Sequence, residues 1–250
     1  MRILLLGGTT EAGLLARALA DDNADAVYSY AGRTDAPITQ PLPTRVGGFG
    51  GVAGLQAYLA TEGITHVIDA THPFAAQIST NAVLACQATS IPLLALERAP
   101  WVATAQDDWL HVPDLASAAT SLGTTPRRVF LAIGRQHLAA FATAPQHQYL
   151  LRLVDPPTDD LPLPRTSITI ARGPFTLAGD TALLRDHRID IVVAKNAGGK
   201  GAVAKIAAAR ALGLPVVMID RPQIPDRATV RSVALVMDWV QAHQSALRGV

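Results

Sequence analysis

Short runs of apolar residues alternate with longer helical patterns along the whole chain. Several runs, such as residues 3–6 (ILLL) and 191–193 (IVV), are apolar on both faces. Such runs are typical of parallel strands that helices cover on both sides, so the sequence predicts an α/β fold. The expected strands are 2–6, 26–30, 44–46, 66–69, 92–94, 128–133, 149–153, 167–171, 190–194 and 215–219. The expected helices are 11–20, 54–62, 75–88, 176–186 and 202–212.

A polar segment with glycine and proline, residues 121–126 (SLGTTP), lies near the middle of the chain. About five strands are expected on either side of it. We therefore predict two Rossmann-like domains, 1–122 and 123–250, each a mainly parallel sheet flanked by helices. A single continuous sheet is the alternative.

The composition restricts the class of protein. Apolar residues make up 49% and charged residues 16% of the chain, which describes a packed soluble protein and excludes disorder. Aromatic residues make up 5% and the net charge is +1, with no lysine–arginine run. Nucleic-acid binding is not expected, because it needs a larger basic surface or aromatic platforms for bases.

Cysteine usage and hydropathy point to the cytoplasm. Cys86 is the single cysteine, so no internal disulfide forms, and its apolar helical surroundings predict a buried thiol. The apolar start of the chain stops at Gly7, which is too short for a signal peptide. No apolar stretch reaches the roughly 18 residues that span a bilayer, so we expect no membrane association.

A glycine-rich turn, residues 7–13 (GGTTEAG), follows the first expected strand. Gly8 and Gly13 match the outer glycines of the G-x-G-x-x-G dinucleotide fingerprint, and Thr10 replaces the middle one. The next helix directs free N–H groups and partial positive charge at this turn, which favours a diphosphate. Gly13 is expected to allow close helix–strand packing, and Glu11 to point away or bond a neighbouring loop. A plain strand-to-helix turn is the alternative.

The end of the second strand predicts which dinucleotide binds. NAD enzymes carry an acidic residue there, whereas this chain has Arg33 and Thr34, which suit a 2′-phosphate. We therefore expect NADP(H), although Asp35 is an alternative ribose ligand and Arg33 an alternative surface residue. The residues expected to bind the cofactor are Gly7, Gly8, Thr9, Thr10, Glu11, Gly13, Arg33, Thr34, Gly47, Gly48 and Thr71.

Positively charged and polar residues follow many expected strands, where ligands of doubly wound sheets bind. Together they suggest a polyanionic ligand, although each alone is an ordinary surface residue. The residues expected to bind this ligand are His72, Arg98, Arg135, Arg172, Lys195, Asn196, Gly198, Gly199 and Lys200. His72 suits proton donation, a nicotinamide contact or a carboxylate contact, or it is purely structural. No spacing supports a metal site.

The second glycine-rich turn, residues 195–201 (KNAGGKG), lacks the serine or threonine that completes a phosphate-binding P-loop. Its backbone N–H groups can still bind carboxylates or phosphates, with Lys205 assisting. A tight structural turn is the alternative.

These segments together resemble the precorrin-6A reductase family of cobalamin biosynthesis. The matching segments are 6–12 (LGGTTEA), 69–75 (DATHPFA), 97–98 (ER), 171–175 (ARGPF), 195–201 (KNAGGKG) and 221–222 (RP). Ala197 stands where the family often has serine. The resemblance implies NADPH-dependent reduction of one double bond in the polycarboxylate macrocycle precorrin-6A, giving precorrin-6B.

From this resemblance we expect direct hydride transfer, with NADPH on the first domain and the macrocycle held by Arg172, Lys195 and the 198–201 turn of the second. His72, Lys195 or solvent delivers the proton. The oligomeric state and the presence of cobalt in the substrate stay open.

Two rival interpretations have sequence tests. A short-chain dehydrogenase needs a Tyr-x-x-x-Lys pair, and none of the tyrosines here has lysine four residues on. A methyltransferase with a similar glycine turn would favour an acidic residue that binds the ribose hydroxyls of its cofactor. Arg33 argues against this interpretation. A non-catalytic NADPH sensor, or another NADPH reductase of a polyanionic small molecule, stays open.

Overall fold

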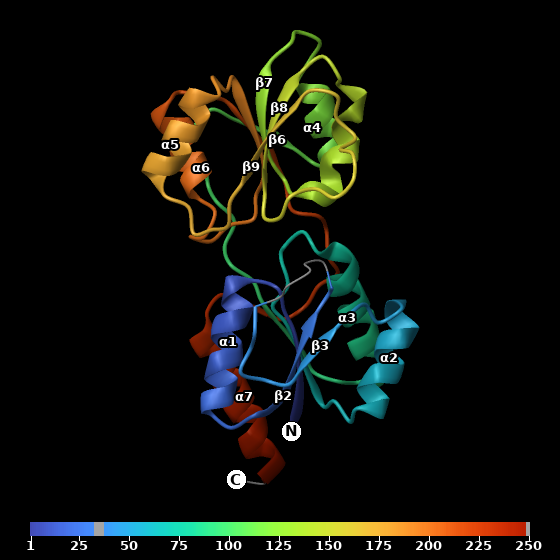
Figure 1. The fold of residues 1–250 in the computed structure, drawn as a ribbon. Helices are drawn as coiled ribbons and strands as arrows, with labels where there is room; N and C mark the ends of the chain where they lie inside the picture. Colours follow the sequence, from blue (N-terminus) through green and yellow to red (C-terminus); the bar gives the residue numbers. More distant parts are fainter. Residues whose placement is uncertain (33–37, 249–250) are drawn as a thin grey trace. The chain divides into compact units, whose positions relative to one another are not determined.

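The chain folds into two α/β units in the computed structural model, which describes residues 1–32 and 38–248 (Figure 1). The first unit comprises Met1–Ala99 and Gln223–Val250, and the second comprises Pro100–Pro222. Each contains one six-stranded sheet in which all pairings are parallel. The expected doubly wound α/β fold with two Rossmann-like domains is confirmed, and the alternative of one continuous sheet is wrong.

The sheet of the first unit has the strand order β3-β2-β1-β4-β5-β12. The chain moves outward from the central strand β1 to β3 and then returns to β4, so the strand order reverses between β1 and β4. Dinucleotides bind at such a reversal, outside the carboxyl ends of the strands. The strands are β1 (Arg2–Leu6), β2 (Asp25–Tyr30), β3 (Thr44–Val46), β4 (His66–Asp69), β5 (Leu93–Leu96) and β12 (Thr229–Val230).

Both faces of β1 are buried from Ile3 to Leu6, which explains the apolar run of these four residues. Ile3 and Leu5 pack in a core with α1 (Thr10–Asp21) and α7 (Val233–Arg248). Leu4 and Leu6 pack in a second core with α2 (Gly51–Thr61) and α3 (Ala76–Thr89). Figure 1 shows these two helix pairs on opposite faces of the sheet, which leaves its carboxyl edge to the loops.

The second unit repeats this arrangement with the order β9-β8-β7-β10-β11-β6, so its reversal lies between β7 and β10. Helices α5 and α6 cover one face of the sheet and α4 the other (Figure 1). The strands are β6 (Trp109–Val112), β7 (Arg128–Ala132), β8 (Gln148–Leu153), β9 (Thr166–Ile170), β10 (Ile191–Lys195) and β11 (Val216–Ile219). The helices are α4 (Leu115–Ser121), the 3-10 helix η1 (Arg135–Thr143), α5 (Leu177–Asp186) and α6 (Ala204–Ala211).

The units do not divide at the boundary expected between residues 122 and 123. β6 and α4 precede that point but belong to the second unit, because β6 pairs with β11 (Trp109↔Val216). β12 and α7 follow it but belong to the first unit, because β12 pairs with β5 (Thr229↔Ala95). Long-range pairing therefore completes each sheet, and the segment 121–126, which starts at the last residue of α4, lies within the second unit.

Among the described residues, no helix has the length and apolar character needed to cross a membrane.

Candidate functional site

The turn after β1 is fixed by Tyr28 on the neighbouring strand. A Cβ atom at Gly7 would lie 2.1 Å from a ring carbon of Tyr28, whose side chain is fully buried, so glycine is required there. The N–H of Gly8 donates to the Tyr28 hydroxyl at 2.8 Å. Burial raises the pKa of Tyr28 far above its ordinary value, so the hydroxyl stays neutral. Gly7 and the Gly8 N–H thus shape the turn, while Gly8 itself is exposed with φ +114°.

Thr9 caps α1 and also joins it to β4. Its hydroxyl oxygen accepts from the Ala12 N–H at 3.1 Å and donates its proton to the Ala70 carbonyl at 2.8 Å. The Gly13 N–H donates to the Thr9 carbonyl. Within the described residues, this cap leaves the N–H groups of Thr10 and Glu11 for a ligand. Thr10 is exposed, so its hydroxyl is the one at this turn that faces solvent.

Glu11 bonds a neighbouring loop, as expected. Its carboxylate lies 2.7 Å from the guanidinium of Arg98, which follows β5. Arg98, expected on the substrate, therefore lies beside the first turn of α1. The tight packing role predicted for Gly13 is wrong, because a Cβ there would approach its nearest neighbour, Gln40, only to an ordinary 3.7 Å.

The residues predicted to recognise the ribose phosphate, Arg33 and Thr34, lie outside the described residues, as does Asp35. The nearby turn after β3 is held by an arginine that the sequence analysis missed. Arg45 donates to the carbonyls of Gly47 at 2.9 Å and Gly48 at 3.1 Å. Its guanidinium also stacks 3.9 Å from the ring centroid of Phe49. An arginine two residues before Gly-Gly-Phe was the available signal.

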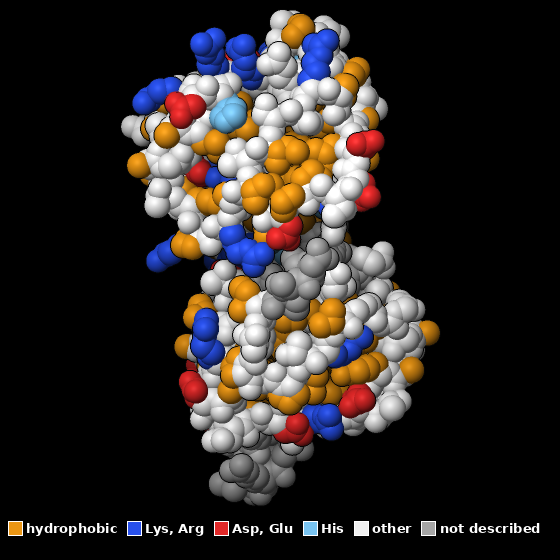
Figure 2. All heavy atoms as spheres, viewed as in Figure 1, with side chains coloured by type: hydrophobic (Ala, Val, Ile, Leu, Met, Phe, Trp, Pro, Cys, Tyr) orange, Lys and Arg blue, Asp and Glu red, His pale blue; other side chains and the backbone are white. Residues whose placement is uncertain are grey.

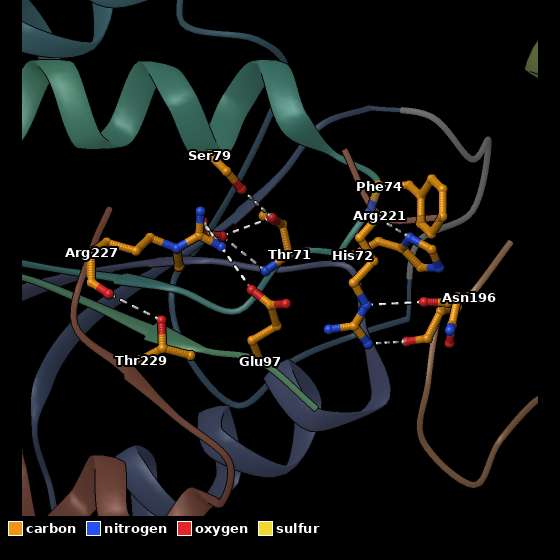
Figure 3. A network of polar contacts seen from close by, with 11 residues as sticks. Thr71, His72, Phe74, Ser79, Glu97, Asn196, Arg221, Arg227 and Thr229 are labelled. Atoms are coloured by element: carbon orange, nitrogen blue, oxygen red, sulfur yellow. Dashed lines mark hydrogen bonds and ion pairs between the residues drawn. The ribbon is translucent and has the colours of Figure 1, made fainter. Parts of the chain in front are cut away.

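The turn after β4 carries His72. Asp69, the last residue of β4, accepts hydrogen bonds at one carboxylate oxygen from the Thr71 N–H (3.1 Å) and hydroxyl (2.7 Å). The Thr71 hydroxyl, expected at the cofactor, is therefore held by Asp69. The N–H of Phe74 donates to Nδ1 of His72 at 3.2 Å (Figure 3). A neutral His72 ring thus carries its proton on Nε2.

In the second unit, Trp101 holds the glycine-rich turn after β10. The Trp101 N–H donates to the side-chain oxygen of Asn196 at 2.8 Å, and the Asn196 amide donates back to the Trp101 carbonyl at 3.0 Å. The indole N–H donates to the Gly199 carbonyl at 2.8 Å. Asn196, expected on the substrate, therefore uses its side chain to bind Trp101, a residue that sequence reasoning missed.

The same turn has further side-chain support. Arg221 donates to the carbonyls of Asn196 at 2.9 Å and Ala197 at 3.2 Å (Figure 3). The ammonium of Lys205 donates to the Ala202 carbonyl at 2.7 Å. Gly198 and Gly199 have φ values of +69° and +73°, which glycine adopts readily. Helix α6 begins two residues later than expected, because this held turn extends to residue 203.

Four of the expected substrate cations, Arg135, Arg172, Lys195 and Lys200, lie at the carboxyl edge of the second sheet. Lys195 ends β10 with 9% of its surface exposed, and Lys200 is exposed on the turn that follows. Arg135 lies 3.1 Å from Asp159, and Arg172 lies 3.5 Å from Asp155. Both arginines are about half exposed, and such ion pairs contribute little stability, so a ligand carboxylate can replace the acidic partner. On the face in Figure 2, Lys and Arg side chains are spread over separate places on both units.

The 171–175 segment is supported by a buried ion pair that the sequence analysis did not anticipate. Arg152 on β8 contacts Asp180 on α5, and both side chains are at most 9% exposed. The Arg152 guanidinium also stacks 3.6 Å from the ring centroid of Phe175, the last residue of this segment. The pair therefore anchors the segment that carries Arg172.

Known proteins resemble this chain over its whole length. Residues 2–241 match the family model described as precorrin-6x reductase CbiJ/CobK. The chain is 63% identical over 249 residues to a precorrin-6A reductase of Rhodobacter capsulatus, covering 100% of this chain and 99% of that protein. It is 47% identical over 241 residues to one of Rhodococcus erythropolis, covering 96% and 97%.

More distant relatives carry a different name. A cobalt-precorrin-6A reductase of Priestia megaterium is 31% identical over 233 residues, covering 89% of this chain and 91% of that protein. Among solved structures, one titled CobK precorrin-6A reductase has a TM-score of 0.93 at 63% identity and covers 97% of each chain. The observed fold is thus shared with a solved relative over both units.

Proposed function

The chain belongs to the precorrin-6x reductase CbiJ/CobK family, and from this premise we propose that it is a precorrin-6A reductase of cobalamin biosynthesis that uses NADPH. It is an oxidoreductase, and reduction in this family implies a nicotinamide cofactor. The observation that carries the proposal is the 63% identity over essentially the full length of a precorrin-6A reductase. The reaction adds a hydride and a proton across one carbon–carbon double bond, which gives precorrin-6B and NADP⁺.

The first unit fits a dinucleotide at the reversal between β1 and β4. Gly8 is exposed, and among the described residues nothing lies within 4 Å of a Cβ built on it, so its backbone is open to a diphosphate. The N–H groups of Thr10 and Glu11 at the start of α1 would bind that diphosphate. Arg98 pairs with the Glu11 carboxylate and so offsets its repulsion of phosphate.

Selectivity for NADPH is assigned to Arg33 and Thr34 after β2. A guanidinium binds a phosphate through two charge-assisted hydrogen bonds, whereas it offers no matched partner for the 2′-hydroxyl of NADH. The turn at Gly47 and Gly48, which Arg45 holds, follows β3, the strand that pairs with β2 in the same sheet.

The second unit supplies the charges for a polycarboxylate macrocycle. Arg135, Arg172, Lys195 and Lys200 follow or end three strands of one sheet, and the backbone of the 198–201 turn adds N–H donors. Trp101 and Arg221 hold that turn in shape without the ligand, which lowers the entropy lost on binding. We assign Asn196 a positioning role, because its side chain binds Trp101, which holds this turn.

When bound, the reduced nicotinamide supplies the hydride, and the chain has to orient both reactants and provide a proton. The imidazolium form of His72 is one proton donor, and forming it requires the Phe74 N–H to release Nδ1. The ammonium of Lys195 is a second, and solvent is a third. The relatives named precorrin-6A reductase resemble this chain more closely than those named cobalt-precorrin-6A reductase, which supports a cobalt-free substrate.

The test is to follow NADPH absorbance while the purified chain is incubated with precorrin-6A, with NADH in a parallel reaction. We expect oxidation of NADPH at a rate that depends on precorrin-6A, and formation of precorrin-6B. NADPH that binds but is not oxidised would support the alternative of a non-catalytic sensor. Oxidation only with another polyanionic small molecule would support a different reductase.

A further inference from the structure

We propose that Asp69, held by Arg227, is a positioning residue for the turn that carries His72. This proposal rests on the proposed function, in which His72 on that turn is one of the proton donors. Asp69 and Arg227 are far apart in the sequence, and the sequence analysis assigned a role to neither.

Asp69 is a buried charge at the reversal point of the first sheet. It ends β4, where its backbone pairs with Leu6 of β1 on one side and Ala95 of β5 on the other. Its side chain is 1% exposed. A carboxylate is costly to bury unless partners satisfy it, so its presence here requires an explanation beyond packing.

One carboxylate oxygen of Asp69 shapes the next two residues. Both the N–H and the hydroxyl of Thr71 donate to it, which makes a local turn that fixes the backbone entering His72. The turn continues when the Ala75 N–H donates to the His72 carbonyl at 2.7 Å and the Phe74 N–H to Nδ1. The direction of the His72 ring therefore depends on Asp69 through Thr71.

The second carboxylate oxygen of Asp69 faces Arg227. The two groups lie 3.6 Å apart, and this oxygen has no hydrogen-bond partner among the described residues. Arg227 is 8% exposed and also donates to Glu97 at 3.1 Å (Figure 3). Arg227 lies just before β12 in the C-terminal segment. This segment therefore supplies both the edge strand that pairs with β5 and the countercharge of Asp69.

Glu97 provides a matched control, because it contacts the same guanidinium from the end of β5 rather than from the strand that leads into His72. In Glu97→Gln, the new side-chain oxygen can still accept from Arg227. In Asp69→Asn, the amide can present its oxygen to Thr71 only by turning its NH₂ group toward the Arg227 cation. Only the Asp69 variant therefore disturbs the His72 turn.

The experiment measures kcat and KM for NADPH with precorrin-6A as substrate for the wild type, Asp69→Asn and Glu97→Gln. We expect Asp69→Asn to lower kcat about 10- to 100-fold, since small misplacement of a reacting group has effects of this size. KM for NADPH should change less than about twofold, because the diphosphate binds at α1. Glu97→Gln should stay within about twofold of wild type in both constants. Equal losses in the two variants, or an unchanged Asp69→Asn, would overturn the proposal.

A second measurement separates this proposal from the proposed function. The ¹⁵N signals of the His72 ring, identified by their loss in His72→Gln, report its environment without any substrate. They should shift in Asp69→Asn and stay in place in Glu97→Gln, and the reverse pattern or no shift counts against positioning. If the wild type oxidises no NADPH, the proposed function fails, and the ring signals alone decide the positioning role.

Discussion

The hydroxyl of Thr9 donates to the carbonyl of Ala70 at 2.8 Å, which fixes the turn after β1 to the end of β4. The same oxygen accepts the N–H of Ala12 and so caps α1. One side chain thus sets both the start of the helix and its position relative to the neighbouring strand. These are the two parts of the first unit that a dinucleotide would contact.

Replacing Thr9 with valine should therefore destabilise the first unit. Valine keeps the shape but loses the cap and leaves the Ala70 carbonyl without its donor, so we expect a loss of about 1–3 kcal/mol in the free energy of unfolding. Thr9→Ser keeps the hydroxyl and should lose less than about 0.5 kcal/mol. Urea denaturation followed by circular dichroism measures both values. Equal stability of the two variants would contradict the role assigned to this hydroxyl.

Much of this arrangement could be predicted from the sequence. Most strands contain a short apolar run, such as residues 3–6 in β1 and 191–194 in β10, and every strand except β6 and β12 was recognised within a few residues. β12 has two residues and β6 carries the exposed Leu110 and His111, so neither has a local signature. Their pairing with β5 and β11 decides where the units divide, and such long-range pairing leaves no local pattern in one sequence.

The residues of the candidate site could likewise be predicted only in part from the sequence. The glycine turns and the His72 segment were visible because glycine and strand-end positions are local features. Trp101 and Arg227 act through contacts with distant residues, which only the tertiary structure brings together. Cys86 was predicted to be buried, and it is; burial and the nearby Asp69 charge raise the pKa of its thiol to about 12.

Alanine at Gly7 should be poorly tolerated for a steric reason. The added Cβ would lie 2.1 Å from the Tyr28 ring, which is buried and cannot move aside freely. We expect a loss of about 1–3 kcal/mol in unfolding free energy, as for other overpacked sites. Gly48→Ala is the control, since among the described residues nothing lies within 4 Å of a Cβ there and its φ is not left-handed. Its stability should stay within about 0.5 kcal/mol of wild type, and a similar loss in both variants would refute the steric argument.

Arg33→Ala tests the cofactor assignment. If this guanidinium binds the 2′-phosphate, its loss should raise the Kd for NADPH about 10- to 100-fold, the size expected for lost charge-assisted hydrogen bonds. The Kd for NADH should change less than about twofold, because NADH lacks that phosphate. Arg17→Ala removes the same charge from an exposed position on α1 and should leave the ratio of the two constants unchanged. Calorimetric titration gives all the constants, and equal weakening of both cofactors by Arg33→Ala would show that the residue does not sense the phosphate.

The stability of the first unit should fall as the pH is lowered, because of His66. His66 is 5% exposed, and its ring packs edge-to-face against Trp239 and His243. Burial, with a smaller effect of the His243 charge, lowers the pKa of His66 from 6.5 to about 4. Between these values the unfolded chain binds a proton that the folded chain does not, so stability declines from about pH 7 to pH 4 and this contribution levels off below.

The decline assigned to His66 is roughly 1–3 kcal/mol, and it is measured as the difference between wild type and His66→Phe, which keeps an aromatic ring but does not titrate. Urea denaturation at pH 7, 5.5 and 4 should show a smaller loss of stability in His66→Phe than in wild type. His187→Gln, at an exposed position after α5, should keep the wild-type pH dependence. If wild type and His66→Phe lost the same stability across this range, the buried imidazole would not be the group that titrates, and the packing of β4 against α7 would not depend on its neutrality.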